Sequence, residues 1–387
     1  MPFSGSIFTN VAGATTAVAG DIVQSAVWDA IHTDYATAFT QVLSQVVSEI
    51  TNRNILWMNG GCEIWQHGAG SAASIAVASA TTLYTADRWY LLNDVSLAQV
   101  VSAQVGLTSQ SNLAARIRRN VGITTTLGCS FNYPLDTDEI IRMRGKIVTF
   151  SCVVKAGANW SPTNGTLLAS FYVGTGSVSK RGVAFSGETT VLSIATNLTA
   201  GGAVTAISGS SSAIVPITSS QAELQFTWVP TGAAGAADDI TIDDVQIECQ
   251  LSAATWTPTN FDRLDFPTML AGCKRFYHKT VDYSLAPAAG TGGYQNAVGW
   301  LAVANSSPWI WWQYPVEMRA TAGITTYNPI TATNSNWHAL ITSVDVTVSV
   351  DSTSLGAKGV LITGVTATAT LLNTHLYYIH LAASAGI

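Results

Sequence analysis

Short runs of alternating or β-branched residues, separated by clusters of Gly, Asn, Ser and Thr, dominate this chain from residue 55 onward. Their length and regular spacing are typical of an all-β sandwich. The clearest runs before residue 263 are 146–154, 166–173, 189–194, 222–228 and 240–248. The later runs are 294–303, 309–314, 324–327, 344–350, 359–372 and 375–382. The sequence therefore predicts a mainly β protein, with a jelly-roll-like β-sandwich over residues 55–262 and a second, smaller β-sandwich over residues 263–387.

Charge is scarce in the 387 residues: 10% are charged, 48% are hydrophobic, and the formal net charge is −6. No basic block is longer than RIRR at residues 116–119, which is too short to bind nucleic acid electrostatically.

No run of about 18 consecutive apolar residues is present, which argues against membrane insertion. The first residues also lack the basic and apolar segments of a secretory signal. The five cysteines form no Cys-x-x-Cys pair, so we expect buried free thiols rather than a zinc site.

Residues 21–50 carry apolar side chains at steps of three and four, the periodicity of an amphipathic helix. The narrow apolar seam of this helix is formed by Trp28, Ile31, Tyr35, Phe39 and Val46. A narrow seam favours association with copies of the same helix over burial in a large core. The alternative is an ordinary amphipathic helix that packs on a neighbouring domain. We assign residues 1–54 to an N-terminal segment that contains this short helix.

The most unusual local pattern is NGGCEIWQHG at residues 59–68, which is followed by TADRW at residues 85–89. Two adjacent glycines permit backbone angles that other residues resist, so a tight chain crossing is expected there. A second acidic pattern, DDITIDDVQIE, lies at residues 238–248, near the end of the predicted sandwich. The first and last strands of a jelly-roll are neighbours, so the two patterns are expected to meet.

This juxtaposition predicts a metal site. Calcium prefers carboxylate and carbonyl oxygens, and the paired patterns resemble the structural calcium site of many carbohydrate-binding modules. We therefore predict Glu63, Asp243 and Asp244 as ligands of a structural calcium ion. The alternative is that these acids form strand-end turns and ion pairs with Arg88 or another base.

The sequence gives no support for catalysis. The six histidines are scattered, without HExxH, and GxSxG, P-loop and GxGxxG motifs are absent. The acidic residues lie at predicted strand ends and in loops rather than as the carboxylate pair that glycoside hydrolysis requires. We therefore expect no enzyme activity and no cofactor other than the calcium.

Aromatic residues crowd the last 90 or so residues. Strand alternation places Trp309 and Trp311 on one face of their strand and Trp312 on the other, so some of these rings must be structural. An exposed ring can stack on the apolar C–H face of a pyranose. The alternative is that the rings form only core and subunit interface. The predicted glycan-binding side chains are Trp300, Trp309, Trp311 and Trp337.

Several short motifs resemble segments of bacteriophage fibre proteins and occur in the same order. They are QSAVWDAI at 24–31, the pattern at 59–68, CKRFYHK at 273–279, PVEMRA at 315–320 and the final segment 378–387. The chain is thus similar to phage tail-fibre, head-fibre or spike proteins that contain a carbohydrate-binding-module-like β-sandwich.

The resemblance implies a homotrimeric structural protein of the virion. Its N-terminus is expected to dock on capsid, neck or tail proteins, and its β-domains to point outward and adhere to host surface polysaccharide. Two other functions stay open from the sequence: a decoration or collar protein that binds no receptor, and a polysaccharide depolymerase.

Overall fold

A computed structural model describes residues 32–39, 54–93, 97–250, 258–287, 297–301, 310–331, 333–367 and 375–386. The chain divides into two units, Met1–Arg53 and Asn54–Ile387. The protein is mainly β, as the sequence predicts. Within the described residues no helix is both long and apolar enough to cross a lipid bilayer.

Residues 32–39 of the first unit form a helix. The side chains of Tyr35 and Phe39 are 55% and 69% exposed. Their spacing of four residues places both on one face of the helix. The other predicted seam residues, Trp28, Ile31 and Val46, lie outside the described residues. Self-association through this helix therefore stays a prediction.

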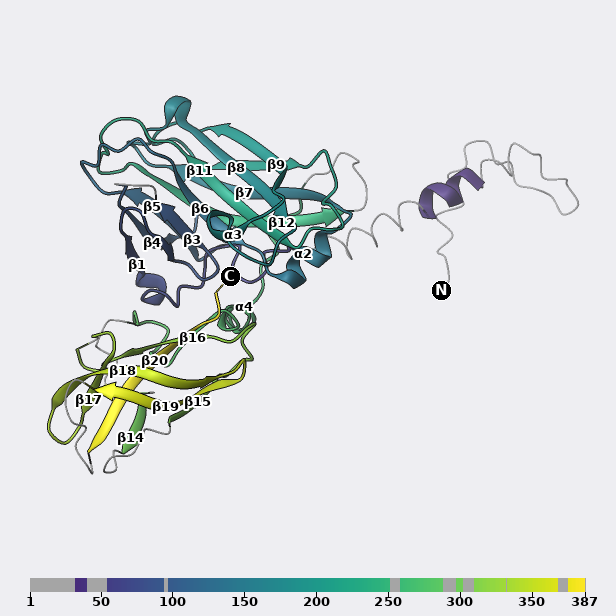
Figure 1. The fold of residues 1–387 in the computed structure, drawn as a ribbon. Coiled ribbons are helices and arrows are strands. Elements are labelled where there is room, and N and C mark those ends of the chain that lie inside the picture. Colours follow the sequence, from purple (N-terminus) through teal and green to yellow (C-terminus); the bar gives the residue numbers. More distant parts are fainter. Residues whose placement is uncertain are drawn as a thin grey trace, which may run out of the picture. The chain divides into compact units, whose positions relative to one another are not determined.

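Two six-stranded antiparallel sheets form the β-sandwich, and most of their strands are labelled in Figure 1. In spatial order, the first sheet contains β1 (Ser74–Val77), β4 (Gln99–Val105), β5 (Leu113–Arg119), β12 (Asp239–Gln250), β7 (Ile147–Ala156) and β10 (Thr205–Ser210). The second sheet contains β2 (Thr82–Tyr84), β3 (Tyr90–Asn93), β6 (Cys129–Pro134), β11 (Gln221–Trp228), β8 (Thr166–Gly174) and β9 (Thr189–Asn197). The strands that the sequence predicts in this region are therefore present.

The core between these sheets contains several aromatic rings. Trp89 stacks on Phe131 with ring centroids 4.7 Å apart and planes at 8°, and it meets Tyr133 edge-on at 5.1 Å. Each such ring buries about 200 Å², which makes these side chains large contributors to the hydrophobic free energy of folding.

The five cysteines are buried free thiols, which confirms the prediction made from their spacing.

Short helices interrupt the β structure, although the hydrophobic pattern indicates none after residue 54. They are α2 (Thr137–Met143), α3 (Arg181–Ala184), α4 (Phe266–Lys274) and the 3₁₀ turns η2 (Gly70–Ala72) and η3 (Thr163–Gly165). Asp136 and Glu139 form a capping box at the start of α2. Asp265 caps α4 by accepting from the backbone N of Thr268 at 3.1 Å. Helices of one or two turns give too little periodicity to detect, but the Asp-x-x-Glu cap was present in the sequence.

Eight further strands form a third sheet. They are β13 (Tyr277–Lys279), β20 (Leu376–Ser384), β17 (Asn336–Ala339), β18 (Val344–Leu355), β19 (Gly359–Ala367) and β15 (Ile310–Gln313), with β14 (Val298–Leu301) and β16 (Gly323–Tyr327) also paired to β20. Trp312, Trp337 and Tyr377 belong to its core, which is separate from that of the sandwich. The predicted alternation is confirmed in β15, because Ile310 and Trp312 are buried while Trp311 is exposed.

Candidate functional site

The double glycine at residues 60–61 marks a close crossing with β12. The backbone N of Val245 donates to the Gly60 carbonyl at 3.2 Å. A Cβ atom at Gly60 would lie 2.2 Å from the Val245 carbonyl oxygen, so no other residue fits without a shift. The predicted tight crossing is confirmed. The segment that borders β12 here consists of turns rather than the first strand of the sandwich.

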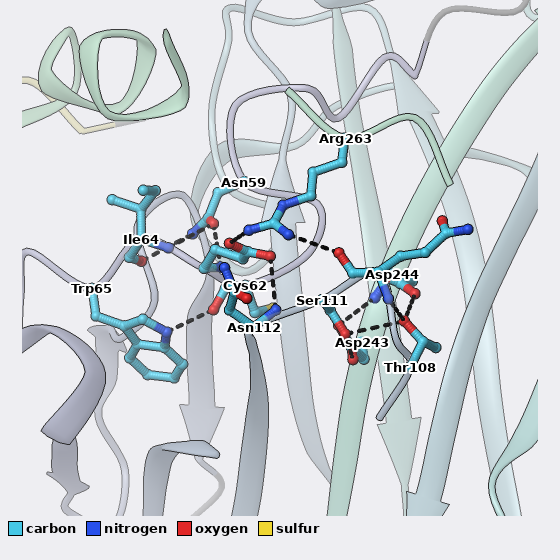
Figure 2. A network of polar contacts seen from close by, with 12 residues as sticks. Asn59, Cys62, Ile64, Trp65, Thr108, Ser111, Asn112, Asp243, Asp244 and Arg263 are labelled. Atoms are coloured by element: carbon cyan, nitrogen blue, oxygen red, sulfur yellow. Dashed lines mark hydrogen bonds and ion pairs between the residues drawn. The ribbon is translucent and has the colours of Figure 1, made fainter. Parts of the chain in front are cut away.

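Glu63 follows this crossing, and its side chain is 3% exposed. One carboxylate oxygen forms an ion pair with the guanidinium of Arg263, and the other accepts from the backbone N of Asn112 at 3.2 Å. Arg263 also donates to the carbonyl of Gln110 at 2.8 Å. Figure 2 shows Arg263 extending toward the turn that carries Asn59. The buried carboxylate thus has a cationic partner from residues that follow the sandwich.

Asp243 and Asp244 lie in the same network, at an irregularity in the β12–β7 register (Figure 2). Asp243 Oδ2 accepts from the backbone N of Leu107 at 2.7 Å and from Ser111 Oγ at 2.5 Å. Asp244 Oδ2 accepts from Thr108 Oγ1 at 2.7 Å. Burial, with a further contribution from the Asp244 charge, raises the pKa of Asp243 to about 6. The loop at residues 107–112 therefore links these aspartates to Glu63.

This donor set does not fit the predicted calcium ion. Every carboxylate oxygen of Glu63, Asp243 and Asp244 except Asp244 Oδ1 already accepts a contact from the protein. Calcium needs about six to eight oxygen ligands, and no group of three or more ligating side chains suited to a metal occurs among the described residues. The geometry favours the alternative of an ion pair, with Arg263 as the base in place of Arg88.

The rest of the 59–68 pattern contacts the residues that follow α4. Gln66 Nε2 donates to the carbonyl of Tyr277 at 3.0 Å. The backbone N of Trp65 donates to the hydroxyl of Tyr283 at 2.9 Å, and that hydroxyl donates to the Glu63 carbonyl at 3.2 Å. The pattern therefore joins the sandwich to the third sheet.

Arg88 adds a buried charge to the same junction. Its Nη2 pairs with Glu139 at 2.7 Å, with both side chains at most 2% exposed. Its guanidinium lies 3.7 Å from the ring centroid of Phe276. Because both charges are removed from water, loss of either partner would leave the other uncompensated. Arg88 is thus a structural residue.

A groove of about 710 Å³ lies beside β13 and β15. Trp312 and Tyr314 line it, with ring centroids 5.1 Å apart and planes at 88°. His278 also lines it and stacks near Trp312 at 5.3 Å. Gln313 and Lys274 add hydrogen-bonding and charged groups. Apolar rings with a few polar groups are the usual lining of a small-molecule or sugar site.

Two buried polar atoms of this groove, Tyr314 Oη and His278 Nδ1, have no hydrogen-bond partner among the described residues. A buried polar atom without a hydrogen-bond partner destabilises the folded state by about 1–3 kcal/mol. Burial raises the pKa of Tyr314 to about 12, so its hydroxyl keeps its proton near pH 7. Burial, assisted by Lys274, lowers the pKa of His278 to about 4, so its ring is neutral there. Both atoms keep unused hydrogen-bonding capacity beneath the groove surface, which a ligand reaches only if their side chains shift.

The structure separates the tryptophans that the sequence predicts as glycan contacts. Trp337 is 0% exposed, which removes it as a glycan contact, because its ring is enclosed in the core. Trp300 is partly buried and packs against that core, and Trp309 lies outside the described residues. Trp311 is 58% exposed, and atoms of its ring approach within about 3 Å of the Cβ position of Gly359. Trp311 thus keeps an accessible ring surface.

Sequence reasoning missed Tyr314 and His278 as site residues. Alternation assigns Tyr314 to the core face, and it is indeed 5% exposed, with an enclosed hydroxyl, although the residue borders the groove. His278 belongs to the CKRFYHK motif, which indicates a family and not a role. No pattern in the sequence brings these two side chains together, because they lie 36 positions apart.

Comparisons with known proteins give only distant similarities. No family model and no curated protein matches the chain. A tailspike protein 4 enzymatically active domain of bacteriophage CBA120 is 14% identical over 52% of this chain, with a TM-score of 0.28. This chain spans 22% of the length of that tailspike chain.

Two carbohydrate-binding modules are also similar. A xylan-binding domain of family CBM22 is 11% identical over 46% of this chain and 98% of its own length, with a TM-score of 0.29. The CBM27-1 module of Caldicellulosiruptor saccharolyticus, solved with mannohexaose, is 15% identical over 40% of this chain and 84% of its own, with a TM-score of 0.26. These scores are too low to transfer a ligand or a role, so the groove must be interpreted from its own residues.

Proposed function

We propose that this chain is a structural fibre or spike protein of a phage virion that adheres to host surface glycans through the groove beside β13 and β15. The observation that carries the adhesion proposal is the groove itself, in which the Trp312 ring lies beside Tyr314, His278 and the exposed Gln313. Tyr314 Oη and His278 Nδ1 are enclosed and have no partner among the described residues, so a small shift of their side chains toward a ligand would let it remove the cost of burying them.

The functional groups of a sugar complement the side chains that line this groove. Its hydroxyl groups both donate and accept hydrogen bonds, which suits the Tyr314 hydroxyl and the neutral His278 ring. Its C–H face suits the edges of aromatic rings. A volume of about 710 Å³ is large enough for a short oligosaccharide. Trp311 supplies an exposed ring on the other side of β15 that can extend contact along a longer polysaccharide.

The virion part of the proposal is supported by the ordered series of fibre-like motifs from residue 24 to residue 387. A narrow apolar helix face, with Tyr35 and Phe39 exposed, suits a homotrimer. The partners would then be two further copies of the chain, capsid, neck or tail proteins, and host polysaccharide. A charged content of 10% fits a rigid, Ser- and Thr-rich β surface.

A glycan array of bacterial surface polysaccharides, probed with the full-length chain, tests the adhesion proposal. We expect binding to a restricted set of glycans and weaker binding by Gln313→Ala, which changes a groove side chain. Gln110→Ala, which removes an exposed amide side chain that lines neither groove, is the matched control. Absence of binding to all glycans and to host strains would instead favour a decoration or collar protein. Release of reducing ends from a bound polysaccharide would identify a depolymerase.

A further inference from the structure

The outer face of the first sheet carries a second groove, of about 280 Å³, far in sequence from β13 and β15. Side chains of β4, β5, β12 and β7 line it, among them Gln104, Arg116, Thr241 and Lys155. Strand alternation places these side chains outward, while Ile117 of β5 packs into the core. The groove is therefore a feature of the sheet face itself.

The strand register aligns three of these residues. Thr241 of β12 lies directly opposite Arg116 of β5 and directly opposite Lys155 of β7. Neighbouring strands are about 4.8 Å apart, so the two cationic residues are about 10 Å apart with a hydroxyl between them.

Positive charge is concentrated on this face although the whole chain has a net charge of −6. Arg116 pairs with Asp239, which fixes its guanidinium at the groove. Lys155 is exposed, and neither it nor Arg118, the next outward residue of β5, has an ion pair among the described residues. Asp243, the next acid along β12, is 0% exposed beneath the 107–112 loop. The accessible charge of the face is thus positive.

We propose that this face binds an acidic polysaccharide, through oxyanion substituents on its sugar units. Lys155 would supply a point charge, and Arg116 a planar fork suited to carboxylate or sulfate. Thr241 and Gln104 would hydrogen-bond to sugar hydroxyls. The residues that line this groove include no aromatic ring on which a nucleobase could stack. Because recognition on this face rests on charge and hydroxyl contacts rather than on ring stacking, an acidic sugar polymer fits better than a single-stranded nucleic acid.

The test uses the full-length chain with polygalacturonate, dextran sulfate, neutral dextran and oligo(dT), by calorimetry at near-physiological salt. Polygalacturonate and dextran sulfate distinguish carboxylate from sulfate as the preferred oxyanion. We expect at least one of them to bind, neutral dextran not to bind, and Lys155→Gln to weaken binding about tenfold. Lys358→Gln, which removes the same charge from an exposed position in the third-sheet region, should leave the affinity unchanged.

Three results would overturn the proposal: no binding of either acidic polymer, equal affinity of Lys155→Gln and wild type, or oligo(dT) binding as tight as polysaccharide binding. Tyr314→Phe separates this site from the proposed adhesion groove. If Tyr314→Phe and not Lys155→Gln abolishes binding of the acidic polymer, the ligand occupies the β13–β15 groove. The present proposal would then be wrong while the adhesion proposal stands.

Discussion

The guanidinium of Arg263 forms an ion pair with the buried carboxylate of Glu63, although the two residues are 200 positions apart. Arg263 comes from the segment after the sandwich, so this contact fastens that segment to the start of the sandwich. It also supplies the positive charge that the sequence assigned to calcium. The Arg263 guanidinium differs from a bound calcium ion in one testable way, because a chelator cannot remove it.

We therefore expect excess EDTA to leave the melting temperature of the full-length protein unchanged. Arg263→Ala should lower the free energy of unfolding by about 3 kcal/mol, because it leaves the buried Glu63 carboxylate without its cationic partner. Arg118→Ala, which breaks no ion pair among the described residues, should cost less than about 0.5 kcal/mol. Denaturant unfolding measures both values. A clear fall in melting temperature with EDTA, reversed by calcium, would contradict the ion-pair account.

Gly60 provides a steric test of the chain crossing. Gly60→Ala would place a Cβ 2.2 Å from the Val245 carbonyl oxygen, and we expect a loss of about 3 kcal/mol in unfolding free energy. Gly128→Ala is the control, since the nearest atom to its added Cβ is 3.8 Å away. Thermal melts of both variants give the comparison. Equal stability of the two variants would show that the crossing relaxes at little cost.

The buried Glu223 should make stability depend on pH. It is 0% exposed and accepts from the Tyr90 hydroxyl at 2.8 Å and from the backbone N of Arg181 at 3.0 Å. Burial raises the pKa of Glu223 to about 7, above the value of about 4.3 in an unfolded chain. Because the native state keeps this proton longer, the stability from this group is full below about pH 4 and is lost as pH rises through about 7.

The Glu223→Gln side chain cannot titrate, so this variant should lose the contribution of residue 223 to the pH dependence of stability. Between about pH 5 and 8, its unfolding free energy should fall less than that of wild type, by on the order of 2 kcal/mol. Glu188→Gln, whose side chain is 36% exposed in the wild type, should follow the wild-type profile. Identical profiles for Glu223→Gln and wild type would mean that Glu223 is ionised throughout this range.

The predicted trimer can be tested at the N-terminal helix. Light scattering of the full-length protein should give three times the chain mass of 40.6 kDa. Substitution of both Tyr35 and Phe39 by Ser should shift the mass toward one chain, because it removes two apolar side chains from the seam. Thr33→Ser is the control on the same helix. A monomeric wild type would refute self-association in the isolated protein.

The sequence was most informative where the periodicity is strong. Alternation and β-branched runs predicted β7, β8, β9, β11 and β12 of the sandwich and most strands of the third sheet, although not β13 or β17. Alternation also predicted the buried and exposed faces of β15, because a period of two determines which side chains face the core. The patterns at 59–68 and 238–248 correctly predicted that Glu63 lies near Asp243. They could not identify the partner, because Arg263 is one base among 17 and its position depends on the path of the chain after β12.

The β13–β15 groove could not be predicted from the sequence, because it too depends on how distant segments meet. Trp337 and Trp311 look alike in sequence, yet one is enclosed and the other is 58% exposed. That difference depends on which strands pair, and pairing between distant segments leaves no local signal. The unpartnered Tyr314 hydroxyl likewise becomes visible only when all its neighbours are known.

The proposed binding of glycan in the β13–β15 groove involves the Tyr314 hydroxyl. Its most direct test is Tyr314→Phe in the full-length chain, measured against the strongest glycan found on the array. We predict an affinity about tenfold weaker and a melting temperature that is unchanged or higher, because the variant removes a buried hydroxyl without a partner. Tyr172→Phe, in the sandwich, should bind as wild type does. An unchanged affinity for Tyr314→Phe would contradict the account.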